Sequence, residues 1–288
     1  MRKCNNEIAF GKDVKMDDFS KEIMVQATTE IAKDAYSDTV HPAAQNLGEI
    51  FGTITGFFNH VVMYPLKLIN SKYELKAKEF RERLENDYKN IPEQNVAEPD
   101  LHIVGPALES LKYNIMDDDL ANMFANLLIS NMDTDTKGLC TPAFIRIIEQ
   151  MSPNDAKVFK AIYECCQKNP GVAVCEIKFV SAENKDRIAA LQLPKHVVDI
   201  NLFQMDPYQI SKSIQMLARL GLVDIDYLTS FVDDKVYQKL IEQDYYKTTH
   251  NLLESKTHKK FIPTINIEGT ITINELSQDF ATVCLRKK

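Results

Sequence analysis

Apolar residues recur every three to four positions through the first half of the chain, as they do in amphipathic helices. This spacing predicts one helix from Met16 to Tyr36 and a second from His41 to Tyr64, with Pro65 kinking or ending the second. A charged segment from Asn70 to Lys89 carries charged side chains four positions apart and predicts a solvent-exposed helix. The first half is therefore predicted to be almost wholly helical.

Capping residues mark further helix starts. An apolar helix around Pro106–Ile115 is followed by three acidic residues at 117–119, which complement the positive end of a helix dipole. Thr141-Pro142 and Ser152-Pro153 each place a capping hydroxyl before a first-turn proline. After the acidic residues, helical spacing predicts a buried stripe. Its members are Leu120, Met123, Phe124, Leu127 and Leu128.

The hydrophobic period changes after about residue 170. β-branched or alternating runs predict strands over residues 172–180 and 222–228, and between them a helix is predicted from Asp206 to Arg219. Two β-branched runs between Phe261 and Asn274, joined by Glu268-Gly269, predict a late β-hairpin. This order of helices, strand and hairpin matches a winged helix-turn-helix.

Charge divides the chain near the same place. Residues 1–168 hold 19 basic and 26 acidic side chains, whereas residues 169–288 hold 15 of each. The predicted fold is mainly α, with an N-terminal helical bundle over residues 1–150 and a winged helix-turn-helix-like α/β domain over residues 151–288.

Composition narrows the function classes. The net charge of −7 argues against a protein that coats nucleic acid over its whole surface. The first fifteen residues are charged throughout, and no run of 18 uncharged apolar residues follows, so we expect a cytoplasmic protein. The six cysteines form no C-x-x-C pair and have no histidine at metal-ligand spacing, so we expect reduced thiols and no metal site.

Motifs for catalysis are missing from the sequence. It holds no phosphate-binding loop, no nucleophile elbow and no H-E-x-x-H zinc motif. We therefore expect a protein that is not an enzyme and needs no cofactor. A nuclease centre built from scattered carboxylates is the alternative, because such ligands converge only in the fold.

Three of the nine glycines repeat at intervals of four residues: Gly48, Gly52 and Gly56. Each glycine in a helix interior costs about 1 kcal/mol against alanine, so three on one face indicate that another backbone approaches there. One interpretation is a tight helix crossing within the bundle or in a homodimer. The other is that the segment 47–69, with Phe57 and Phe58, leaves the bundle and enters a membrane when the protein is triggered.

Basic residues in the second half suggest nucleic-acid binding. Lys212 and Arg219 lie on the helix that would enter a DNA groove, and three lysines precede the predicted wing. These are Lys256, Lys259 and Lys260. Such charges would bind phosphate with an affinity that falls as salt rises. Many winged helices instead contact proteins, so a protein-interaction module and a DNA-binding regulator are both open interpretations.

Four segments resemble the Abi-alpha family, the abortive-infection alpha proteins of bacteria. They are Ala35–Gly52, Pro106–Asp133, Pro142–Phe159 and Leu217–Ile225. The resemblance implies a role in phage resistance by halting growth of the infected cell, and it carries no catalytic motif. We therefore expect a phage-defence protein that acts through a protein partner or a homo-oligomer, with a phage component as trigger. Membrane action and nucleic-acid binding are the alternatives.

Overall fold

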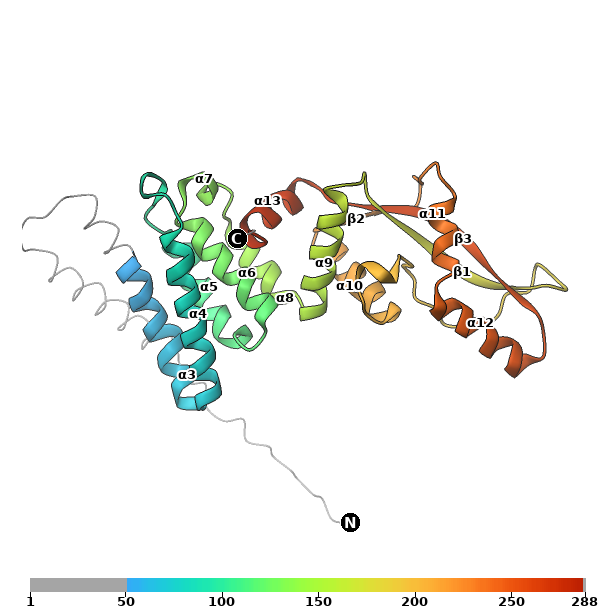
Figure 1. The fold of residues 1–288 in the computed structure, drawn as a ribbon, viewed down its shortest axis with the longest axis horizontal. Helices are drawn as coiled ribbons and strands as arrows, with labels where there is room; N and C mark the ends of the chain where they lie inside the picture. The colour runs from blue at the N-terminus through green and yellow to red at the C-terminus, as the bar shows by residue number, and fades with distance from the viewer. Residues whose placement is uncertain (1–50, 287–288) are drawn as a thin grey trace, which may run out of the picture. The chain divides into compact units, whose positions relative to one another are not determined.

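The computed structural model describes residues 51–286, which are mainly helical and include one three-stranded antiparallel sheet (Figure 1). The helix predicted over residues 16–36 lies outside this range. The first helices are α3 (Tyr64–Ile69), α4 (Ser71–Lys89), α5 (Leu101–Asn114), α6 (Asp118–Asn131), α7 (Thr134–Lys137), α8 (Pro142–Gln150) and α9 (Pro153–Cys166). They are followed by β1 (Val172–Ser181), α10 (Pro207–Arg219), β2 (Asp224–Asp226), α11 (Lys235–Ile241), α12 (Asp244–Thr257), β3 (Phe261–Thr272) and α13 (Glu275–Cys284).

The helix that contains Pro65 does not end there. Residues 51–58 are α-helical, Asn59–Met63 form a π-helical segment, and α3 follows directly. A proline cannot donate to the carbonyl four residues earlier, and its ring crowds that carbonyl. The wider π turn ahead of Pro65 accommodates the ring, so the helical run continues to Ile69.

The predicted helix starts are confirmed. The side chains of Asp117, Thr141 and Ser152 each accept a hydrogen bond from a backbone N–H of the first turn that follows. All five residues of the predicted stripe on α6 are buried. The helix α5 begins at Leu101, earlier than expected, so Pro106 lies inside it.

The charged helix α4 is confirmed, and it also contributes to the core. Its Arg83 pairs with Asp87 one turn later at 3.1 Å, as the four-residue spacing predicts. The opposite face buries an alanine and two large side chains. These are Ala77, Phe80 and Leu84.

The sheet has the strand order β1-β3-β2, with β3 in the centre. The predicted hairpin over residues 261–274 is wrong, because β3 is one continuous strand that pairs with β1 along its length. Gly269 lies inside this strand, where a Cβ atom would come within 2.6 Å of the carbonyl oxygen of Asp226. The glycine therefore permits the end of β2 to approach the central strand and does not make a turn.

The helices α11 and α12 occupy the connection between β2 and β3 and contact the sheet. With one side of the sheet they form a small second core. Its buried members are Cys175, Ile177, Val197, Tyr237, Leu240 and Tyr246. Between β1 and α10 the chain forms only the short 3-10 helix Ile200–Leu202.

The last helix, α13, returns the chain from the sheet to α6 (Figure 1). Its Phe280 ring lies edge-on to Phe144 and Phe159, with centroids 5.3 and 5.4 Å away. Asn126 and Ser130 of α6 donate side-chain hydrogen bonds to backbone carbonyls near the end of α13, at 2.8 and 3.1 Å. Buried residues from both sides of position 150 thus share one core, and the division into domains at that position stays a prediction.

We expect Phe280→Ala to lower the free energy of unfolding by about 3–5 kcal/mol, because the ring is fully buried between two others and its removal leaves a cavity. Thermal unfolding followed by circular dichroism measures the loss. Leu276→Ala, on a side chain of the same helix that is 39% exposed, is the matched control and should cost much less. Equal losses would contradict the packing described above.

Candidate functional site

The predicted groove-contacting residues lie on the exposed side of α10. This helix begins at Pro207, and the side chain of Asp206 caps its first turn. The buried face of the helix packs on α9. Lys212 and Arg219 are both exposed. Arg219 donates a hydrogen bond to the side chain of Gln150 at 3.1 Å, so one of the two cations already has a polar neighbour.

The three lysines before β3 are also exposed. Lys256 lies in the last turn of α12, which ends at His258 in the left-handed backbone conformation, and Lys259 and Lys260 lead into β3. They do not join Lys212 on one surface, because α10 and the end of α12 lie apart (Figure 1). The predicted nucleic-acid contacts therefore lie on two separate basic surfaces instead of one.

The structure adds two cations that sequence reasoning missed. The backbone N–H of Ala182 donates to the carbonyl of Lys260 at 2.9 Å, and that of Ser181 donates to the carbonyl of Arg187 at 2.9 Å. These bonds place the loop carrying Lys185 and Arg187 beside the start of β3. We call residues 181–188 and 256–262 the sheet tip. Its five Lys and Arg side chains make no salt bridge with the residues that the structure describes.

The part of the glycine-bearing segment within residues 51–69 packs in the core through the face that carries Ile54, Phe58 and Val62. Phe58 is fully buried and its ring stacks on Phe80 at 5.6 Å, while Phe57 is half-buried against the same core. Apart from the adjacent residues and the backbone of the same helix, no atom of residues 51–286 lies within 4 Å of the position that a Cβ on Gly52 or Gly56 would occupy. Gly48 falls outside the described range, and a close crossing with a second copy stays a prediction.

No helix within residues 51–286 combines the length and the apolar character needed to cross a bilayer.

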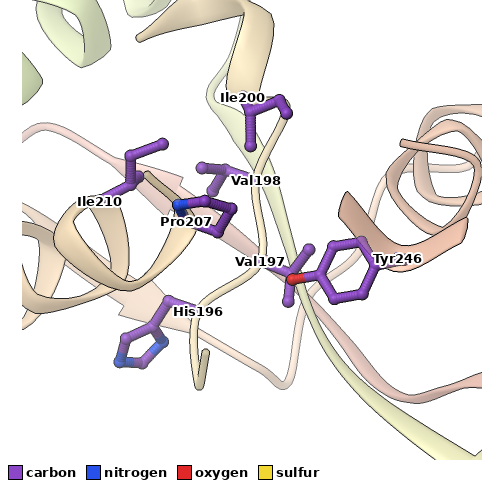
Figure 2. A pocket seen from close by; sticks show the side chains of 7 residues that line it. All are labelled: His196, Val197, Val198, Ile200, Pro207, Ile210 and Tyr246. Carbon is purple, nitrogen blue, oxygen red and sulfur yellow. The ribbon is translucent and has the colours of Figure 1, made fainter. Parts of the chain in front are cut away.

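A small pocket, closed by its own side chains, lies between α10, α12 and residues 196–200, which precede α10 (Figure 2). It is lined by His196, Val197, Val198, Ile200, Pro207, Ile210 and Tyr246, and their side chains leave no room for a water molecule. The Tyr246 hydroxyl points toward Val197 in Figure 2 and has no hydrogen-bond partner among the described residues. The pocket is therefore part of the packing and not a cavity that holds a ligand as it stands.

His196 is the buried histidine of this pocket. Its Nδ1 lies 2.9 Å from the hydroxyl of Tyr227, and its backbone N–H donates to Ser211 Oγ at 3.0 Å. Burial lowers the pKa of His196, and the neighbouring Lys195 lowers it further. Burial also keeps the pKa of Tyr227 high, so its hydroxyl can donate to a neutral imidazole. This pair was not singled out by its position in the sequence.

Burial also raises the pKa of several cysteine thiols. It raises the pKa of Cys140 and Cys166 to about 11 and that of Cys175 to about 12. The pKa of the fully buried Cys284 is raised as well. Thiols with such pKa values stay protonated near neutral pH and are poor nucleophiles and poor metal ligands.

Among residues 51–286, no three His, Cys, Asp or Glu side chains lie close enough to one another to hold a metal ion.

Comparison with known families supplies the decisive observation. Residues 72–284 match the family described as Abortive infection alpha. The chain belongs to the abortive infection alpha family. No curated protein and no solved structure matches the sequence.

Some of the candidate surfaces lie inside the residues that match the abortive infection alpha family, and one lies before them. The sheet tip, Lys212 and Arg219 fall within the matched residues 72–284. The glycines and phenylalanines of the segment 47–69 precede them. The surfaces of α10 and of the sheet tip therefore belong to the part of the chain on which family membership rests.

We expect His196 to make stability depend on pH. Because its folded-state pKa lies below the ordinary value of 6.5, the unfolded chain binds the proton more readily. Its contribution to stability is present above that value and is lost as the pH falls through it. The melting temperature should therefore drop less between about pH 7.5 and about pH 5.5 in His196→Gln than in the unaltered chain. The exposed His102→Gln is the control, and a drop unchanged in His196→Gln would contradict the assignment.

Proposed function

We propose that this member of the abortive infection alpha family is a non-enzymatic phage-defence protein of bacteria that acts by binding a protein partner. The family match over residues 72–284 is the observation that carries the proposal. A phage component would act as the trigger in the cytoplasm, and the response would halt growth of the infected cell.

Two features of the structure support binding over catalysis. The pocket around His196 is filled by its own side chains, and the high pKa of the buried cysteines disfavours thiolate chemistry. Exposed charged and apolar side chains instead cluster at the sheet tip and on the loop between β2 and α11. Surfaces of that kind are suited to contacts with a macromolecule.

Infection of cells with and without the gene tests the proposal. Expression should reduce the number of plaques, and an excess of phage should arrest or kill most infected cells, because the response sacrifices the cell. Plaque counts and colony survival are the measurements. Unchanged plaque numbers would remove the defence role, whereas reduced plaques with full survival of infected cells would remove the abortive mechanism.

DNA binding by a winged helix is the second candidate. The chain order α9, β1, α10, β2, β3 and the strand order β1-β3-β2 follow the winged-helix pattern, with α10 where the groove-contacting helix stands. Lys212 is exposed on that helix. The interpretation must also account for the helices α11 and α12 at the position of the wing and for the single 3-10 turn ahead of α10.

The DNA interpretation predicts that the whole chain binds duplex DNA at low salt and loses affinity steeply as salt rises. Lys212→Glu should weaken binding, since it removes a phosphate contact and adds repulsion. Lys72→Glu, at the start of α4, is an exposed control that should bind as before. Fluorescence anisotropy of a labelled duplex measures the affinity, and no binding at low salt would eliminate this candidate.

Membrane action is the remaining alternative for the toxic step. It would require the segment 47–69 to leave the core, which means separating Phe58 from Phe80 and exposing Ile54 and Val62. Burial of such side chains is worth roughly 1.5–3 kcal/mol each, so a trigger would have to supply that free energy.

A further inference from the structure

The loop between β2 and α11 exposes two large apolar side chains. Leu228 is 97% exposed and Val232 is fully exposed. Single apolar residues on a surface are common, but two on one short loop form an unusual projection. We call residues 227–234 the apolar loop.

Hydrogen bonds hold the apolar loop in this conformation. The carboxylate of Asp226 accepts from the backbone N–H of Leu228 at 2.7 Å and from the hydroxyl of Thr229 at 2.8 Å. At the other end, the backbone N–H of Phe231 donates to the buried hydroxyl of Tyr237 at 2.9 Å. The two side chains are thus presented on a preordered backbone, which lowers the entropy cost of docking.

The surroundings of the apolar loop are acidic. Asp226, Asp233 and Asp234 lie in or beside it, and Lys235 is the nearest cation in the sequence. An acidic surface is repelled by nucleic acid and by anionic lipid. The charge therefore favours a protein occupant whose apolar patch has a basic rim.

The sheet tip has this complementary chemistry. Val180 pairs with Ile188 on one side and with Ile262 on the other, so their side chains share one face of the sheet. The two isoleucines are 57% and 53% exposed. The same short segments of chain carry five cations and two acidic residues, so the net charge of the sheet tip is positive. The cations are Lys185, Arg187, Lys256, Lys259 and Lys260, and the acidic residues are Glu183 and Asp186.

The two surfaces do not meet within one copy of the chain. The apolar loop leaves the sheet where Asp226 pairs with Thr270, and the sheet tip lies at Phe261, nine residues along β3. At 3.3 Å per residue that separation is about 30 Å. A second copy can bring them together, and a two-fold axis would form both contacts at once.

We propose that the apolar loop of one copy docks on the sheet tip of a second copy, forming a symmetric dimer. Leu228 and Val232 contact the isoleucine face of the partner, and the aspartates of the loop face its lysines. The pairing does not depend on the defence role, so the two proposals can fail separately.

Sedimentation velocity of the full chain tests the dimer. We expect dimers at micromolar concentration in low salt, and dissociation as salt screens the charges. Leu228→Ser with Val232→Ser should weaken the dimer at least about tenfold. Tyr113→Ser, on a side chain of α5 that is 76% exposed, is the control and should leave the dimer intact.

Charge exchange separates this contact from nonspecific association. Asp233→Lys with Asp234→Lys should weaken the dimer, as should Lys259→Glu with Lys260→Glu. Mixing these two variants should restore both contacts in the mixed dimer, because each loop then faces a tip of opposite charge. Combining all four changes in one chain should also restore both contacts. A chain that stays monomeric at about 100 µM in low salt would overturn the proposal. A dimer that is unaffected by the loop and charge variants would overturn it as well.

Discussion

The docking of α13 against the helices is the constraint on which the rest of the described structure depends. The helix is the last element of residues 51–286, and only two residues separate it from the end of β3. Packing Phe280 between Phe144 and Phe159 fixes the position of that end of the sheet. Arg286 adds an ion pair with the buried Asp133 at 2.8 Å, beyond the last turn of α13. Moving the helix would break this pair and leave the charge of Asp133 buried without a partner, so the pair favours the observed position of α13.

From this anchor, β3 carries two of the candidate surfaces, the apolar loop and the sheet tip. One end of the strand supports β2 and the apolar loop, and the other end supports the sheet tip with its five cations. The small core under α11 and α12 keeps the strand covered on one face. The filled pocket at His196 belongs to the same supporting structure, because its packing and the hydrogen bond to Ser211 hold residues 196–200 against α10. Both surfaces thus lie on one sheet, and the helices fix that sheet at the end of β3 that leads into α13.

Local signals in the sequence predicted much of this fold. Caps at Asp117, Thr141 and Ser152 act within one helical turn, and the stripe on α6 repeats within one helix, so both can be recognised without the tertiary structure. Gly269 misled the prediction because a glycine inside a strand and a glycine in a turn look alike in sequence. Only the approach of Asp226 distinguishes them.

The candidate surfaces were less predictable for the same physical reason. Lys256, Lys259 and Lys260 are close in sequence and could be recognised as a group. Lys185 and Arg187 join them only through backbone bonds between segments more than seventy residues apart. Likewise, the spacing of the glycines at 52 and 56 predicts a close contact with another backbone, and no other element of residues 51–286 makes it. Long-range placement carries no local signal.

Native-state hydrogen exchange measures most directly whether α13 joins the helices and the sheet into one cooperative unit. As denaturant rises, amides of α6, α9 and β3 should converge on one common opening free energy, because loss of the α13 contacts exposes all three. Opening of β1 and β3 at low denaturant, with α6 and α9 still fully protected, would contradict the account.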